Sequence, residues 1–145
     1  MAVAAHVSRV SKEYAPFGYS IMESISVPFT LVAGTDVYIP LAYAEDADLY
    51  LEAASLVALT AFGSEGTNFW TFSLVHGPSG LASEIEVSHA DIGGASTLIG
   101  VNTINDFAID VPIIPQGRAL YLKADAAASA AIESVAAVIR IRRKA

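Results

Sequence analysis

Apolar and polar residues alternate with a period of two along most of this chain. The pattern is clear in the stretches DVYIPLAY, NFWTFSLV, DFAIDVPI, ALYLKA and AVIRIRR. Because successive side chains of a strand point to opposite faces, this alternation predicts strands that pack one face against a core. The predicted core residues are Ile25, Phe29, Val37, Ile39, Trp70, Phe72, Ile109, Leu120, Leu122 and Ile139.

Turns rich in glycine, proline and serine separate these runs, for example at residues 63–66 and 77–80. Pro28, Pro40 and Pro112 fall inside strand patterns. A proline cannot donate a hydrogen bond to a strand ladder, so these residues are expected at sheet edges, bulges or strand ends. Short strands with frequent turns predict an all-β fold. Roughly eight to ten candidate strands favour a jelly roll over a smaller sandwich.

The length of 145 residues allows one domain. We expect an antiparallel, jelly-roll-like β-sandwich over residues 19–145, preceded by an extended N-terminal arm over residues 1–18. Two segments also contain good helix formers. For residues 44–62 the alternation of apolar and polar positions favours two strands. Residues 124–137 are rich in alanine, which favours a helix, but their place between two alternating runs is equally compatible with a hairpin connection.

The composition is more apolar than usual for a small soluble protein. Apolar residues make up 54% of the chain and charged residues 16%, against typical values of about 45–50% and about 25%. A well-filled core under an uncharged surface is one explanation. The second is an obligate oligomer whose subunit interfaces resemble a core cut in half. We favour the oligomer because large exposed apolar patches are rare in soluble monomers, and expect a cyclic trimer.

Positive charge is concentrated at the two ends of the chain. No Lys or Arg occurs between Glu13 and Gly117, a stretch with thirteen carboxylates, whereas four of the eight Lys and Arg residues lie in the last six positions. The net charge is −7. An acidic body repels phosphate and lacks the basic footprint that nucleic-acid binding requires. We therefore expect no nucleic-acid partner.

The chain contains no cysteine, which excludes disulfides, thiolate metal sites and a cysteine nucleophile. Its first residues contain no continuous apolar segment of signal-peptide length, and no charge-free apolar run reaches 18 residues. We expect synthesis in the cytoplasm and no membrane association.

Known catalytic and metal-binding patterns are absent from the sequence. His6, His76 and His89 lack the spacing of zinc ligands, so structural roles are expected for them. The acidic run at residues 45–48 could offer oxygen ligands to Ca²⁺, but it lacks the spacing of a calcium loop and is more typical of a solvated surface. We expect no enzymatic activity, no cofactor and no metal site.

Aromatic residues could instead form a platform for carbohydrate. The candidates for this platform are Tyr38, Tyr50, Trp70 and Phe72. Trp70 alternates with other apolar residues, which is more typical of a core position. The carboxylates Glu84 and Glu86 are spaced like a glycosidase pair on one strand, but nothing in the sequence indicates that either is buried.

The closing stretch IIPQGRALYLKADAAASAAIESVAAVIRIRRK, residues 113–144, has a Pro-x-Gly turn, a strand, small residues and a last strand with basic outward positions. With this ending, the overall organisation of residues 20–144 resembles the small all-β head decoration (cement) proteins of tailed bacteriophages. The resemblance implies a non-enzymatic virion protein on the outer surface of the head. It implies that the protein binds the major capsid protein, commonly as a trimer, and stabilises the shell by bridging coat subunits. Tail, fibre, neck and receptor-binding domains share this style, so a carbohydrate- or receptor-binding module of a phage tail or fibre is the alternative.

The basic ends could dock onto an acidic coat. In the last strand Ile139 and Ile141 are expected to face the core, which turns the intervening arginines outward. The final two basic residues are expected to extend beyond the strand. Arginine suits docking to protein because it forms bidentate pairs with carboxylates, although basic ends could also merely solubilise a frayed terminus. The candidate docking residues are Arg9, Lys12, Arg140, Arg142, Arg143 and Lys144.

Overall fold

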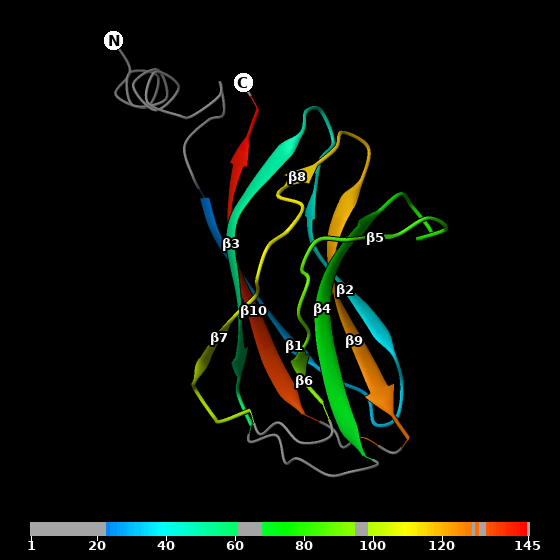
Figure 1. Cartoon of the computed structure of the whole chain (residues 1–145), viewed down its shortest axis with the longest axis vertical. Coiled ribbons are helices and arrows are strands. Elements are labelled where there is room, and N and C mark those ends of the chain that lie inside the picture. The colour runs from blue at the N-terminus through cyan, green and yellow to red at the C-terminus, as the bar shows by residue number, and fades with distance from the viewer. Residues whose placement is uncertain (1–22, 61–67, 95–98, 129, 131–132, 145) are drawn as a thin grey trace.

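The computed structural model describes residues 23–60, 68–94, 99–128, 130 and 133–144. The predicted arm over residues 1–18, with Arg9 and Lys12, lies outside the described residues. Within them the chain forms ten strands, and every pairing between these strands is antiparallel (Figure 1). None of the described segments is a helix of the length and hydrophobicity needed to cross a membrane.

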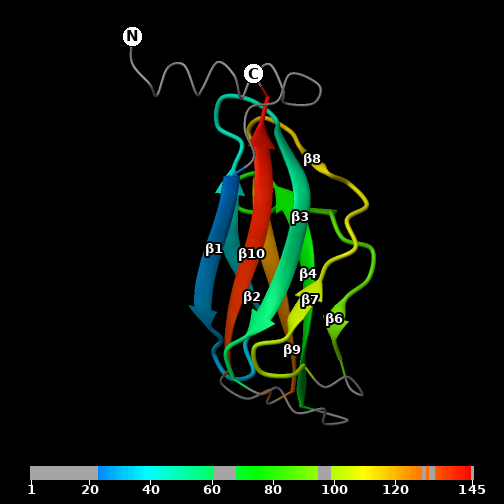
Figure 2. The ribbon, with the colours of Figure 1, turned by 90° about the vertical axis from the view of Figure 1, so that its left-hand side faces the viewer.

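The strands form two five-stranded sheets that pack face to face (Figure 2). We name each sheet after its second strand. The β10 sheet runs in the order β1-β10-β3-β7, with β8 paired to β3, and contains β1 (Glu23–Thr30), β10 (Ser134–Arg143), β3 (Leu49–Ala58), β7 (Ile104–Asp106) and β8 (Ile113–Ile114). The β9 sheet runs in the order β2-β9-β4-β5, with β6 paired to β4, and contains β2 (Val37–Tyr43), β9 (Ala119–Ala127), β4 (Phe69–Gly77), β5 (Ile85–Glu86) and β6 (Ile92–Gly93).

The connectivity is that of a jelly roll. From β1 to β4 the chain passes from one sheet to the other at every step. The last two strands then return to the middle of the sandwich, where β9 lies between β2 and β4 and β10 lies between β1 and β3. Nested pairs of this kind define the jelly roll. The predicted all-β, jelly-roll-like sandwich is therefore confirmed.

The two ambiguous segments are both resolved as strand. Residues 44–62 contribute one strand, β3, and not two, since its alternating apolar face continues from Leu49 to Ala58 without a turn. The alanine-rich segment 124–137 holds the end of β9 and the start of β10. Of the two alternatives left open for this segment, the hairpin does not form, because β9 and β10 belong to different sheets. Helix propensity is overridden here because small side chains such as Ala124 and Ala137 are buried in the sandwich.

The core lies between the sheets and agrees with the predicted set. Ile39, Trp70, Phe72, Leu120, Leu122 and Ile139 are buried. Ile25, Phe29, Val37 and Ile109 are partly buried and pack against that cluster. The first three belong to the edge strands β1 and β2, each of which is covered by a strand on one side only.

The prolines occupy the positions predicted for them. Pro28 lies in the edge strand β1, and Pro40 lies in the edge strand β2 beside a break in its register with β9. Pro112 precedes β8. None of the three lies within a central strand, where the missing backbone N–H of proline would remove a hydrogen bond from the ladder.

Candidate docking surface

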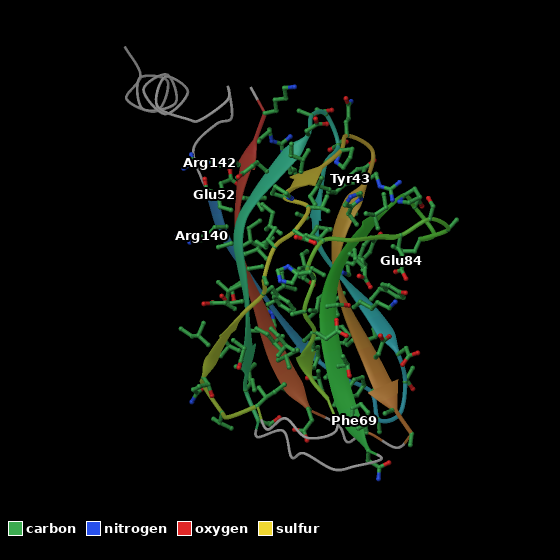
Figure 3. The ribbon with its side chains drawn as sticks, in the orientation of Figure 1. Tyr43, Glu52, Phe69, Glu84, Arg140 and Arg142 are labelled. Carbon is green, nitrogen blue, oxygen red and sulfur yellow. The ribbon has the colours of Figure 1, made fainter. Side chains whose placement is uncertain are left out.

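The predicted docking strand β10 is central in its sheet and presents two arginines on the outer face. Ile139 and Ile141 are buried, Arg140 is exposed and Arg142 is half-buried. The inward and outward sides of the strand are therefore those predicted from alternation. Figure 3 shows both arginines on the side of the sandwich formed by β1, β10 and β3.

A bulge in β3 makes the two arginines unequal. Arg140 pairs with Ala53 across the ladder, whereas the next residue, Ile141, pairs with Leu51. Glu52 is thus an extra residue in β3, and it lies on the outer face beside the partly buried Ala53. Bulges re-aim side chains in this way. Here the bulge places a carboxylate near one arginine and a methyl group opposite the other.

Arg142 is neutralised within the molecule. Its Nε donates a hydrogen bond to Oε1 of Glu52 at 2.5 Å, and the two side chains are only 19% and 27% exposed. Arg140 makes no hydrogen bond or ion pair to any residue within the described part of the chain. It therefore presents an unneutralised guanidinium on the outer face of the β10 sheet.

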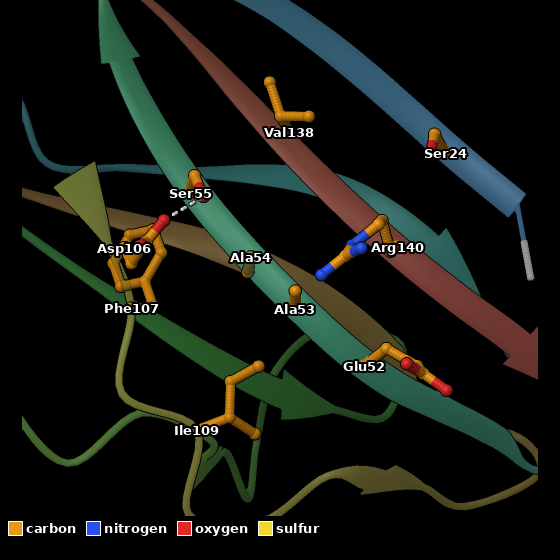
Figure 4. A pocket seen from close by; sticks show the side chains of 10 residues that line it. All are labelled: Ser24, Glu52, Ala53, Ala54, Ser55, Asp106, Phe107, Ile109, Val138 and Arg140. Atoms are coloured by element: carbon orange, nitrogen blue, oxygen red, sulfur yellow. Dashed lines mark hydrogen bonds between the residues drawn. The ribbon is translucent and has the colours of Figure 1, made fainter. Parts of the chain in front are cut away.

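A groove with a volume of about 580 Å³ lies beside Arg140 (Figure 4). Small side chains of β3, among them Ala53 and Ser55, line one part of it, and Val138 of β10 lines another. Asp106 also lines the groove, but its Oδ1 accepts a hydrogen bond from Oγ of Ser55 at 2.6 Å. Both carboxylates of the groove, Asp106 and Glu52, therefore accept a hydrogen bond within the protein. Arg140 donates none to the described residues.

The groove exists because the chain leaves the edge of β3 after β7. The backbone N–H of Phe107 still donates to the carbonyl of Ala54 at 2.9 Å. The following residues then pair with the other side of the sandwich, where Asp110 donates to the carbonyl of Val87 at 2.7 Å. The chain returns to β3 only at Pro112, whose carbonyl accepts from Leu51 at 2.7 Å. The stretch of β3 between these contacts is left uncovered at its edge.

The prediction that Arg143 and Lys144 extend beyond the last strand is wrong for Arg143, while Lys144 follows the end of β10. Arg143 belongs to β10 and pairs with Leu49, and the backbone N–H of Lys144 donates to the carbonyl of Asp48 at 3.0 Å. Both side chains are exposed. The strand continues because β3 and the residue before it offer partners over the whole length, which no local pattern indicates.

The acidic segment at residues 45–48 forms part of a connection between strands. Oδ1 of Asp48 accepts a hydrogen bond from the backbone N–H of Gln116 at 2.8 Å. No group of three or more His, Asp or Glu side chains that could hold a metal ion occurs among the residues described.

The two described histidines differ in their surroundings. His76 is buried, and its Nδ1 accepts a hydrogen bond from Nε of Arg118 at 2.7 Å. Burial, and secondly the charge of Arg118, lower the pKa of His76, so its imidazole is held neutral. His89 is exposed and lies 3.6 Å from Asp110. His6 is outside the described residues.

The candidate sugar platform around Trp70 does not form, because Trp70 is buried. Trp70 is only 3% exposed and stacks on the fully buried Phe72, with ring centroids 6.4 Å apart. Its alternation with other apolar residues correctly indicated a core position. Tyr38 and Tyr50 are partly exposed, but they belong to different sheets and cannot form one surface with Trp70.

These features define an antiparallel jelly-roll β-sandwich protein with a groove beside Arg140 on one sheet. No protein-family model and no curated protein matches the chain. Similar solved structures include a chain of turnip yellow mosaic virus at 100 K, with 13% identity and a TM-score of 0.34, covering 83% of this chain and 92% of that one. A chain of desmodium yellow mottle tymovirus has 14% identity and a TM-score of 0.34, covering 90% and 91%.

A third similar structure is a chain of infectious bursal disease virus, Gx strain. It has 13% identity and a TM-score of 0.36, and the match covers 85% of this chain but 29% of that one. With TM-scores below 0.5, these three similarities carry no argument about function.

Proposed function

We propose that this chain is a non-enzymatic structural protein of a virion, a capsid decoration (cement) protein that bridges coat subunits on the outer surface of the head. It is made in the host cytoplasm, assembles as a trimer and needs no cofactor. Its partner is the major capsid protein. Residues 1–18, with Arg9 and Lys12, form an arm that contributes a second basic contact. The resemblance in organisation over residues 20–144 and the jelly-roll fold support this proposal.

The observation that carries the proposal is the unneutralised Arg140 on an otherwise acidic body. Between Glu13 and Gly117 the sequence contains thirteen carboxylates and no Lys or Arg. A guanidinium without a partner among the described residues suits a carboxylate on an extended segment of the coat, because arginine and carboxylate form two parallel hydrogen bonds. Arg142 differs because its guanidinium already forms an ion pair with Glu52. Arg143 and Lys144 are exposed at the same end of the strand and add positive charge.

Arg140 and Arg142 therefore form a matched pair for testing the docking surface. We expect Arg140→Gln to weaken binding to undecorated shells about tenfold or more, since a hydrogen bond to a charged group contributes about 1.5–3 kcal/mol. Arg142→Gln should weaken binding much less, because Arg142 forms its ion pair with Glu52 of the same chain. Co-sedimentation with purified shells over a range of protein concentrations measures both effects.

Substitution is a sharper test than truncation at this end. Removing residues 142–145 would also remove the pairings of Arg142 and Arg143 with β3, and so would perturb the sheet. Equal shell occupancy by the parent protein and by Arg140→Gln would contradict docking through this groove. Equal losses in Arg140→Gln and Arg142→Gln would indicate a diffuse charge effect.

The trimer is tested separately by native mass spectrometry at micromolar concentration. Exposed aliphatic residues near the edge of the β10 sheet support association, among them Leu59, Val101 and Ile104, the last of which is 69% exposed. We expect a stable species of three chains, because burying such side chains between copies is favourable. A single 15.1 kDa species would contradict the trimer.

The alternative is a carbohydrate- or receptor-binding module of a phage tail or fibre. Its candidate aromatic platform is not available for a sugar, because Trp70 is buried. A sugar-binding role for this chain would have to use another surface.

A further inference from the structure

A second groove lies on the outer face of the β9 sheet. It has a volume of about 360 Å³, within the range of about 300–1,000 Å³ found for small-molecule sites. The β9 sheet is the opposite layer of the sandwich from the sheet that carries Arg140. The residues that line this groove are Pro40, Tyr43, Ser79, Gly117, Ala119 and Tyr121.

Two tyrosines lie on the outer face here, Tyr121 partly exposed by the alternation of β9 and Tyr43 after a bulge in β2. On β9, Leu120 and Leu122 are fully buried, which turns Tyr121 outward between them. On β2 the register with β9 shifts between Pro40 and Ala42, so Leu41 is an extra residue and Tyr43, 56% exposed, stands on the outer face beyond it. Tyr43 pairs with Ala119 across the ladder, so its ring faces a small neighbour. The result is a hollow with aromatic walls and a floor that no large side chain fills.

The ring of Tyr121 is held in place by a chain of contacts. It packs edge-to-face against Tyr38, with centroids 6.3 Å apart and planes at 89°. Lys123 places its Nζ 5.7 Å from the centre of the Tyr38 ring and forms an ion pair of 2.9 Å with Glu84. This pair raises the pKa of Lys123 and lowers the pKa of Glu84. The charge of Lys123, beside the groove, is thus balanced by Glu84.

The far end of the connection that carries Ser79 is also held to the sheet. Arg118 ties the connection between β4 and β5 to the sheet: its Nη2 donates to the carbonyl of Ser83 at 2.5 Å, and its Nε donates to Nδ1 of His76 at 2.7 Å. A rigid aromatic surface loses little conformational freedom when it binds a ligand.

We propose that this groove binds a neutral sugar. None of the six lining residues carries a charge, which disfavours an ionic ligand. The faces of the tyrosine rings suit the C–H faces of a pyranose, while the hydroxyl groups of Tyr43, Tyr121 and Ser79 can exchange hydrogen bonds with its hydroxyls. This binding role is independent of the proposed docking through Arg140, so one sheet can face the shell while the other faces outward.

Titration followed by NMR of the tyrosine rings tests this assignment. The probes are methyl β-D-glucopyranoside, methyl β-D-galactopyranoside and N-acetyl-D-glucosamine at up to tens of millimolar. Galacturonate and a tetraproline peptide serve as the acidic and polyproline comparators. We expect the ring signals of Tyr43 and Tyr121 to shift with at least one neutral sugar. Those of Tyr50, on the other sheet, should stay unchanged.

Two variants separate sugar contact from folding. Tyr43→Ala should weaken binding about tenfold, equivalent to about 1.4 kcal/mol, whereas Tyr43→Phe, which keeps the ring, should lose less. Arg140→Gln, on the opposite sheet, should bind sugar like the parent. Unchanged tyrosine signals with all three neutral sugars, or tighter binding of either comparator, would overturn the proposal. Loss of sugar binding in Arg140→Gln would also overturn its independence from the docking surface.

Discussion

Replacing Trp70 by alanine is expected to lower the free energy of unfolding by about 3–5 kcal/mol. The side chain is buried between the sheets and stacks on Phe72. Removing it deletes a large apolar surface and leaves a cavity that the neighbouring strands can close only in part. Urea denaturation at one fixed protein concentration measures the change, because association makes stability depend on concentration.

Tyr43→Ala is the matched control for this prediction. It also removes an aromatic side chain, but from a position that is 56% exposed, so its effect should stay within about 0.5 kcal/mol. A similarly small change for Trp70→Ala would mean that Trp70 is not packed in the core. That outcome would return Trp70 to the set of candidate sugar-binding residues.

Gly93→Ala is expected to be the second strongly destabilising change. Gly93 lies in β6 with φ of 91°, and a Cβ added to it would stand 2.4 Å from the carbonyl oxygen of Trp70. That oxygen accepts the hydrogen bond from the N–H of Gly94 at 3.0 Å, so moving it breaks the pairing of β6 with β4. The clash should add about 1–3 kcal/mol to the roughly 1–3 kcal/mol of backbone strain.

Gly117→Ala isolates the part of this loss that comes from the clash. Gly117 has a φ of 87°, close to that of Gly93, but a Cβ there would meet no heavy atom within 4 Å. The same denaturation measurement should therefore give a clearly smaller loss for Gly117→Ala. Equal losses in the two variants would show that backbone strain alone, and not contact with β4, makes Gly93 necessary.

Local alternation was sufficient to predict much of the core and the two faces of the last strand. Ile139 and Ile141 were expected to face inward and are buried, and Trp70 was expected in the core and is buried. These predictions succeed because the period of two is a property of the strand itself and needs no knowledge of its partners. The same local view failed for segment 124–137, whose alanines fit a helix, a strand or a turn.

The unequal roles of Arg140 and Arg142 could not be read from the sequence. Both stand at outward positions of one strand, two residues apart. Their difference comes from Glu52, which lies 90 positions before Arg142 in the chain. The bulge in β3 adds Glu52 to one side of the ladder, where it binds Arg142 and not Arg140. Nothing in the sequence around Glu52 indicates that its side chain will contact the last strand.

The sequence by itself determined that this chain forms strands, which faces of them are apolar, and that its positive charge lies at its ends. Alternation, turn residues and composition are local quantities, and they suffice for that much. Only the tertiary structure decided the order of the strands in two sheets, the bulge that leaves Arg140 without a partner among the described residues, and the groove between Tyr43 and Tyr121. Each of these depends on the register between segments distant in the chain, and register is set by packing across the whole sandwich.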